Sequence, residues 1–326
     1  MHSLFSHFPR EPQTTGSAKN MSSAVTATES ETTIRQTLVL ERASGKSRRV
    51  EALLNEHKQE IIEFLSLRPI HTVCMAGYIR DHGVVSAQNR GVFYGCRSTE
   101  GKLEGVALIG HATLIETQSD DALRAFAQLK HQYADSHLVR GEHEMIQRFW
   151  GYYSELGHEP LRACRELLFE QQAALEVQGP VPDLRPATLN DLEEVLKINA
   201  EMIVSECGID PFKKDPAGFR ERLVRRIEQK RVWVWSDRGR LTFKADIFAE
   251  TPQMIYLEGI NVHGTQRGSG HGTRCLSQLG RILLKRSQSI CLLMNERREH
   301  LADFYQKAGY QFRGIYDTIY LHSQER

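Results

Sequence analysis

Apolar residues recur every three or four positions in parts of the first half of the chain, and elsewhere they form short runs. Within residues 51–67 the large apolar side chains keep helical spacing, which predicts a helix that Pro69 ends. Two short apolar runs, 91–96 and 105–109, predict strands joined by a polar turn. Further helices are predicted at about 120–130 and 141–153.

The pattern restarts after a segment rich in Gly and Pro at 176–182. Thr188 and Asp191 then have the spacing of a capping box, which predicts a helix that runs through Met202. The rest of the pattern predicts strands at 184–187, 231–235, 241–249, 256–262, 290–294 and one or two within 310–321, with helices at 219–229, 272–286 and 299–308.

The length of 326 residues suits two domains, each long enough to bury a core. The first 33 residues are rich in Ser, Thr, Gln and Gly, which predicts a disordered tail with Met21 as a candidate start. We therefore expect a tail at 1–33, a first domain at 34–175, a linker at 176–182 and a second domain at 183–326.

Charge and composition exclude several classes of function. The 42 basic and 41 acidic residues leave a net charge of +1, which gives no electrostatic reason to bind nucleic acid or an anionic membrane. A mean hydropathy of -0.44 and the lack of a long apolar run argue against a membrane span, and no secretory signal begins the chain. Six scattered cysteines without a CxxC pair suggest buried thiols in a reducing cytoplasm.

Chemistry is concentrated in a glycine-rich loop, Arg267-Gly268-Ser269-Gly270-His271-Gly272, between a predicted strand and a predicted helix. Glycines allow positive φ and a close approach of the backbone, while the free N–H groups at a helix N-terminus attract an anion such as pyrophosphate. The loop has no lysine after its glycines, which disfavours an ATP-binding P-loop. Thr273 stands where a dinucleotide-binding loop has its third glycine.

The order of elements around this loop resembles the acyl-CoA-binding core of the GNAT superfamily of N-acetyltransferases. Arg267, Gly270 and Gly272 match the family's Q/R-x-x-G-x-G/A signature, and residues 295–314 resemble its second cofactor motif. The resemblance covers about 183–321. It implies that acetyl-CoA is the co-substrate, that the acceptor is a primary amine, and that the amine attacks the thioester directly in a ternary complex. Ser269 stands where many members carry a second basic residue, which predicts modest cofactor affinity.

An amine acceptor is mostly protonated at neutral pH, so the site needs a group that removes a proton. Glu258, on the strand before the loop, is the candidate general base, acting directly or through water. Tyr305 aligns with the family's acid tyrosine and would protonate the leaving thiolate; a core aromatic is the alternative interpretation. The same alignment implies that Asn295 binds the pantetheine arm.

The resemblance further implies that a backbone N–H at the end of the strand 256–262 stabilises the thioester oxygen, which by position indicates Asn261 or Val262. The full predicted cofactor-binding set is Ile260, Asn261, Val262, Arg267, Gly268, Ser269, Gly270, His271, Gly272, Thr273 and Asn295.

Two acidic residues, Glu206 and Asp210, lie in the region where GNAT proteins often shape the acceptor pocket, and they would suit a cationic acceptor. A solvated loop is the alternative. His263 and His271 lack partners at metal-ligand spacing, so no metal site is predicted.

The first domain has a similar order of elements, which suggests a divergent GNAT-like copy. Its equivalent crossing, 111–121, has no glycine loop, and Glu116, Asp120 and Asp121 would repel a pyrophosphate. We therefore expect two GNAT-like domains of the α/β (α+β) class, each a mixed, mostly antiparallel sheet flanked by helices, of which only the second binds CoA. The first would cover the catalytic domain, complete the acceptor pocket or mediate dimerisation.

Three functions stay open at this point. The leading hypothesis is an acyl-CoA-dependent N-acyltransferase. An acyl-CoA or metabolite sensor without turnover is the second, and a nucleotide-dependent enzyme is the third. The sequence does not select the acceptor amine.

Overall fold

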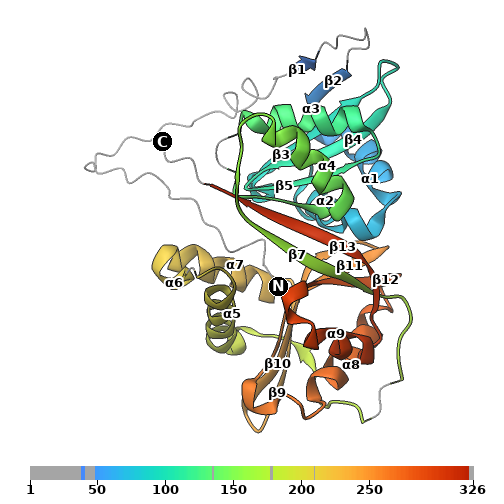
Figure 1. The fold of residues 1–326 in the computed structure, drawn as a ribbon. Coiled ribbons are helices and arrows are strands. Elements are labelled where there is room, and N and C mark those ends of the chain that lie inside the picture. The colour runs from blue at the N-terminus through green and yellow to red at the C-terminus, as the bar shows by residue number, and fades with distance from the viewer. Residues whose placement is uncertain (1–37, 41–47, 134–135, 177–178, 209, 323–326) are drawn as a thin grey trace, which may run out of the picture.

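The computed structural model describes residues 38–40, 48–133, 136–176, 179–208 and 210–322 (Figure 1). The predicted tail 1–33, Met21 and residues 177–178 of the predicted linker lie outside this part of the chain. The first half contains β1 (Leu38–Leu40), β2 (Arg48–Ala52), α1 (Lys58–Ser66), α2 (Pro69–His82), β3 (Gly91–Arg97), β4 (Leu103–Gly110), β5 (Ala112–Thr117), α3 (Asp120–His131), β6 (Leu138–Glu142), α4 (His143–Ser154) and β7 (Pro160–Gln171). The second half contains β8 (Arg185–Pro186), α5 (Leu192–Cys207), α6 (Pro211–Lys214), α7 (Pro216–Glu228), β9 (Val232–Asp237), β10 (Arg240–Glu250), β11 (Met254–Val262), α8 (His271–Leu283), β12 (Ser289–Asn295), α9 (His300–Lys307) and β13 (Gln311–Leu321).

All of these strands join one sheet in the order β1-β2-β3-β4-β5-β6-β13-β7-β12-β11-β10-β9-β8. The pairs β5–β6 and β11–β12 are parallel, and the other described pairs are antiparallel. The expected mixed, mostly antiparallel sheet flanked by helices is thereby confirmed.

The last strand of each half pairs with the other half. β7 from the first half lies beside β12, and β13 from the second half lies beside β6. The two long strands also pair with each other, from Gln311 opposite Glu170 to Leu321 opposite Pro160, and they cross the middle of the molecule (Figure 1). The exchange makes the arrangement roughly two-fold symmetric about β7 and β13.

Helices cover both faces of the sheet. On one face, α8 and α9 pack on β10–β12 in a core that contains Leu257, Leu276 and Tyr305. On the opposite face, α5 and α7 cover β9 and β10, while α2 from the first half reaches β10 and β11 through Val73, which packs in one cluster with Tyr256. The first half therefore supplies part of the cover over the strands that precede the glycine loop.

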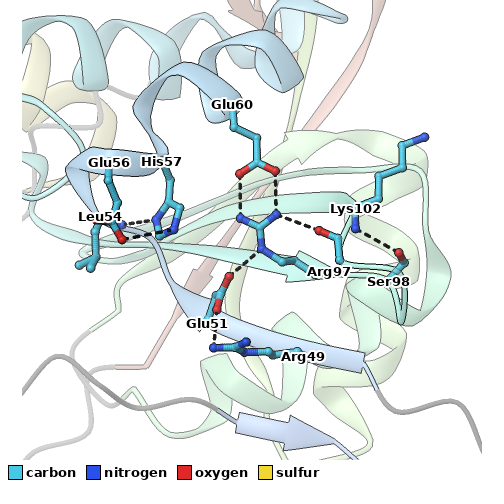
Figure 2. Close-up of polar contacts among 10 residues, drawn as sticks. Arg49, Glu51, Leu54, Glu56, His57, Glu60, Arg97, Ser98 and Lys102 are labelled. Atoms are coloured by element: carbon cyan, nitrogen blue, oxygen red, sulfur yellow. Dashed lines mark hydrogen bonds and ion pairs between the residues drawn. The ribbon is translucent and has the colours of Figure 1, made fainter.

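A partly exposed ion cluster fixes α1 to the sheet (Figure 2). The Arg97 guanidinium on β3 donates to both carboxylate oxygens of Glu60 at 2.7 Å and, through Nε, to Glu51 at 2.6 Å. The bidentate geometry makes this a strong contact, and it lowers the pKa of Glu60.

The first half departs from the predicted elements at three places described below. Residues 48–52 form β2, which pairs with β3, and helix α1 begins only at Lys58. Helix α1 ends at Ser66, before Pro69 as predicted, but Pro69 then occupies the first turn of the unpredicted helix α2, where its missing N–H has no intrahelical partner to lose. Residues 138–142, partly assigned to a helix, form β6 because they pair with both β5 and β13.

The second half follows the predicted order of elements. The Thr188 and Asp191 capping box is present, and it opens a short 3-10 turn that leads into α5. Among the cysteines with described side chains, Cys96, Cys275 and Cys291 are buried, whereas Cys74 and Cys164 are only partly buried, contrary to expectation. No helix in the described part of the chain combines the length and apolarity needed to cross a bilayer.

Candidate active site

The three glycines of the loop serve two different purposes. Gly268 and Gly270 have φ of +78° and +80°, a conformation that favours glycine, and the space where their side chains would lie is open. Gly272 is packed inside, because a Cβ there would approach the Val262 Cγ2 atom to 2.7 Å and the Phe304 ring to 3.1 Å. The first two therefore shape the exposed loop, and the third lets α8 lie close to β11 and α9.

Helix α8 begins at His271 with Gly270 as its N-cap, and no side chain caps it. The first turn of a helix leaves backbone N–H groups without intrahelical partners, and here no capping side chain accepts from them. Arg267 lies beside this turn, where its Nε donates to the Val262 carbonyl at 3.1 Å. The result is an exposed cradle of N–H groups and a guanidinium, which suits an anion.

The side chains of Ser269 and His271 are held by the protein. The Ser269 hydroxyl donates to the Gln266 carbonyl at 2.6 Å. The His271 ring stacks on Trp235, with centroids 5.1 Å apart, and its Nδ1 accepts from Arg274 at 3.1 Å. These side chains make contacts within the protein, so in our interpretation a ligand at the cradle is bound by the backbone N–H groups of Ser269, His271 and the adjacent Thr273.

Strands β11 and β12 separate beside the loop. They pair from Met254 opposite Ser289 to Leu257 opposite Leu292, and their pairing ends there, although β11 continues to Val262 and β12 to Asn295. We call the segments 258–262 and 293–295, which no longer pair with each other, the splay. Because the backbone of β11 has no strand partner on that side of the splay, its polar groups are positioned to bind an extended ligand.

A β-bulge shapes β11 within the splay. Glu258 lies opposite Asp246 and Asn261 opposite Lys244, so that Gly259 and Ile260 together face the single residue Ala245. Gly259 has φ of +60°. A bulge of this kind bends the strand and changes the direction of its backbone groups.

Glu258 is buried, and its Oε1 accepts from Arg226 of α7 at 3.1 Å. Its Oε2 is buried without a hydrogen-bond partner among the described residues. Burial raises the pKa of Glu258, the Asp246 charge adds to this, and the Arg226 charge opposes it. A carboxylate with a raised pKa is better suited to accept a proton near neutral pH than an exposed one.

Tyr305 is also buried, in an aromatic group with Phe304, Tyr310 and Phe169 of β7. Burial raises the pKa of its phenol well above the ordinary value; the Arg298 charge opposes the shift and Glu206 adds to it. The phenol stays protonated at all physiological pH values, which keeps a hydrogen-bond donor in place but makes complete proton transfer harder.

The two proposed catalytic side chains lie on opposite faces of the sheet. Glu258 shares the face of Tyr256, which packs with α2, because strand residues two apart point the same way. Tyr305 belongs to the core under α8 and α9. A substrate bound in the splay, between the strands, would have one of these residues on each side.

The acceptor-side residues have separate surroundings. Glu206 on α5 is half-buried; burial raises its pKa, and the charges of Arg298 and Glu166 also act on it. Asp210 instead caps the short helix α6, where its Oδ1 accepts from the Phe212 N–H at 3.0 Å. The structure therefore brings Glu206 toward the site of Tyr305 and gives Asp210 a local structural role.

Asn295 ends β12 opposite Glu166 of β7. Its Oδ1 accepts from the Arg297 N–H at 2.9 Å, so the side chain caps the turn that follows the strand. Sequence reasoning missed the neighbours that define this site, Arg226, Arg298 and Glu166. Arg298 lies only three residues after Asn295, and this short spacing could have indicated it. No local signal links Arg226 to Glu258.

The first half has an equivalent splay, which protein side chains close. β5 and β6 pair only as far as Leu114 opposite Arg140. Beyond that point Arg68 bridges the two strands, donating to Glu116 at 3.1 Å and to Glu142 at 2.5 Å. A cavity of about 40 Å³ remains nearby, a volume that suits water but no cofactor.

The helix after this closed splay is also capped. The Ser119 hydroxyl accepts from the Ala122 N–H, and Asp120 and Asp121 occupy the first turn of α3. Among the described residues there is no group of three or more His, Cys, Asp or Glu side chains placed to hold a metal ion. The cradle at α8 and the splay beside it are thus the features that point to a ligand.

Comparison with solved structures identifies the fold. A GNAT-family acetyltransferase from Colwellia psychrerythraea matches with a TM-score of 0.54 and 11% identity, covering 88% of this chain and 100% of its own. A GCN5-related N-acetyltransferase from Sphaerobacter thermophilus matches with a TM-score of 0.52 and 13% identity over 84% and 95% of the two chains. A tandem GNAT protein from the clavulanic acid biosynthesis pathway matches with a TM-score of 0.50 and 13% identity over 85% and 100%.

No model of a known protein family matches the sequence, and no curated protein matches it significantly. The solved structures agree over most of the chain, and one of them is itself a tandem protein. The chain therefore has the GNAT acetyltransferase fold, as the residues around Arg267 and Tyr305 predicted, in the tandem arrangement that the order of elements in the first half predicted.

Proposed function

We propose that the protein is an acyl-CoA-dependent N-acyltransferase whose site lies in the second half, residues 183–326. The observation that carries this proposal is the uncapped N-terminus of α8, with left-handed Gly268 and Gly270, directly beside the splay of β11 and β12. The cradle suits a pyrophosphate, and the splay suits an extended pantetheine arm. Acetyl is the donor group that we propose.

In the proposed reaction an acceptor ammonium loses a proton to Glu258, directly or through water. The amine nitrogen attacks the thioester carbon, and the oxygen takes the negative charge. The C–S bond then breaks as the C–N bond is retained, Tyr305 donates a proton to the thiolate, and the second amine proton replaces the one that Tyr305 gave. The products are an amide and free CoA.

Acidic residues at the acceptor side favour a cationic acceptor such as a primary amine. Glu206 lies near Arg298 and Tyr305, and it is the proposed acceptor contact. We assign Asp210 no more than an indirect role there, through its cap of α6. The free thiols suggest a reducing, cytoplasmic setting.

The cradle is tested by placing a negative charge in it. Ser269 is exposed, so Ser269→Asp should fold, and its carboxylate should weaken acetyl-CoA binding about tenfold through repulsion of the pyrophosphate. Ser269→Asn has the same shape without the charge and is the matched control. Titration calorimetry measures both. Equal affinities for the two variants would contradict a pyrophosphate at this loop.

Turnover separates the enzyme from an acyl-CoA sensor, the second candidate. A thiol-release assay with acetyl-CoA over a panel of amines should show amine-dependent CoA release. Binding without release for any amine would favour the sensor. If ATP competes for the site as well as CoA does, a nucleotide-dependent enzyme becomes the better explanation.

A further inference from the structure

A fully buried ion pair lies beside the splay, and none of the steps proposed above uses it. The Lys244 side chain on β10 is 0% exposed, and its ammonium donates to the Asp246 carboxylate at 2.6 Å. Taking two charges out of water costs several kcal/mol per ion, and apolar residues often replace such a pair without loss of stability. Stability alone therefore does not explain the pair.

The same ammonium also contacts the bulge of β11. It donates to the Gly259 carbonyl at 3.2 Å. A Cβ on Gly259 would lie 2.8 Å from both the Lys244 Nζ and the Asp246 carboxylate, so the pair presses against the bulge residue itself. Asp246 holds the ammonium, and the ammonium holds one backbone carbonyl.

Fixing this carbonyl also fixes the next N–H. The peptide unit is planar, and all described peptide bonds are trans, so the Gly259 C=O and the Ile260 N–H point in opposite directions. The carbonyl is directed at the Lys244 ammonium, so the Ile260 N–H points away from that ammonium. Beyond the bulge the His263 N–H donates to the Thr242 carbonyl of β10, so by alternation the Ile260 N–H lies on the edge of β11 that faces away from β10. β10 pairs with one edge of β11, and the other edge is the one that β12 has left after Leu257.

We propose that Lys244 and Asp246 are positioning residues that aim the Ile260 N–H at the thioester oxygen of a bound acyl-CoA. The inference rests on the proposed function, and it replaces Asn261 and Val262 as the expected oxyanion donors.

The polarisation of the bound carbonyl tests the proposal. Infrared difference spectra of acetyl-CoA labelled with ¹³C at the carbonyl should show a shift to lower frequency on binding to the wild-type protein. In Lys244→Met and Asp246→Asn this shift should be largely lost, kcat should fall about 10- to 100-fold, and the acetyl-CoA Kd should stay within about twofold. Lys244→Arg, which keeps a donor, should restore part of the shift.

Two further variants keep the test decisive. If a single substitution prevents folding, the double variant Lys244→Met with Asp246→Leu replaces the whole pair by apolar side chains. Arg226→Met removes a neighbouring, partly buried cation whose guanidinium donates to Glu258 and to the Ile247 carbonyl, so it should leave the carbonyl shift intact. A folded Lys244→Met, or double variant, with the wild-type shift would overturn the proposal.

Failure of the proposed function looks different. If wild-type protein does not bind acetyl-CoA, the function fails, and the positioning role fails with it. If the labelled carbonyl shifts in the wild type and not in Lys244→Met, yet no amine is acetylated, the positioning role stands and the enzymatic function fails.

Discussion

Each half of the molecule has one pair of parallel strands connected by a helix, but the two halves differ where these strands separate. In the second half the strands separate after Leu257, and α8 starts at an uncapped glycine. In the first half Arg68 bridges the separated strands, and Ser119 caps α3. The two splays therefore differ in two described features: side chains bridge the strands of the first and a serine caps the helix that follows it, whereas α8 begins without a side-chain cap.

The largest expected effect comes from the buried glutamates of the two splays. Glu258→Gln removes the proposed base and should lower kcat/KM about 10²- to 10⁴-fold in the thiol-release assay. Glu116→Gln, the counterpart in the first half, should leave kcat/KM unchanged. Equal losses in the two variants would show that the halves do not differ in function.

Tyr305 and Tyr310 provide a second matched pair, because both are buried in the same aromatic group. Tyr305→Phe should lower kcat about 10- to 100-fold through loss of the proposed acid. Tyr310→Phe should leave kcat unchanged, since the Tyr310 hydroxyl has no hydrogen-bond partner in the described residues. Activity that survives Tyr305→Phe would leave Tyr305 as a core aromatic.

The bridge that closes the first splay should matter for stability. Arg68→Met leaves Glu116 buried without its cation, which should cost about 3 kcal/mol of the free energy of unfolding near pH 8. Burial already raises the pKa of Glu116, so the folded state binds its proton more tightly than the unfolded state does. The free energy of unfolding therefore falls as pH rises from the unfolded-state pKa of Glu116 through its higher folded-state pKa. The variant should therefore lose less at pH 5 than at pH 8 in urea denaturation, and it should gain no second acetyl-CoA site in calorimetry.

The pH profile gives a smaller effect. Glu258 accepts a proton only when ionised, and its raised pKa should place the acid limb of kcat/KM above that of an ordinary glutamate. Arg226→Gln removes the charge that opposes the rise in the Glu258 pKa, so the acid limb should move to higher pH. If the acid limb does not move, ionisation of Glu258 does not control kcat/KM.

The smallest effect is expected at the cap of α3. Ser119→Ala should cost about 1 kcal/mol of the free energy of unfolding, without any change in acetyl-CoA affinity. Calorimetry and denaturation of the same variant measure both quantities.

Local patterns in the second half were sufficient to predict its elements and the loop. The segment from Arg267 to Gly272 is contiguous, and the residues that make it an anion cradle are its own glycines and the helix that follows. The capping box at Thr188 depends in the same way on residues three apart. Such features depend on short-range geometry, which a sequence displays directly.

Contacts between distant segments escaped prediction. Arg226 pairs with Glu258 across 32 residues and Arg68 with Glu142 across 74, and the spacing of each side chain gives no sign of its partner. Helix α2 was missed although the helix end before Pro69 was predicted, because a proline that follows one helix also suits the first turn of the next. The residue assignments of the catalytic site and the division at 176–182 stay predictions.

The exchange of β7 and β13 bears on how the protein is made. A fragment that begins at residue 183 would lack β7, which lies between β12 and β13 in the sheet. Both strands would then expose long edges that readily pair with other chains. Neither half is then expected to fold alone. Residue 171 of β7 pairs with residue 290 of β12, and residue 138 of β6 pairs with residue 320 of β13, so each half needs strands from the other. A nascent chain would complete its sheet only after synthesis of its last strand, so each half depends on the other for a complete sheet.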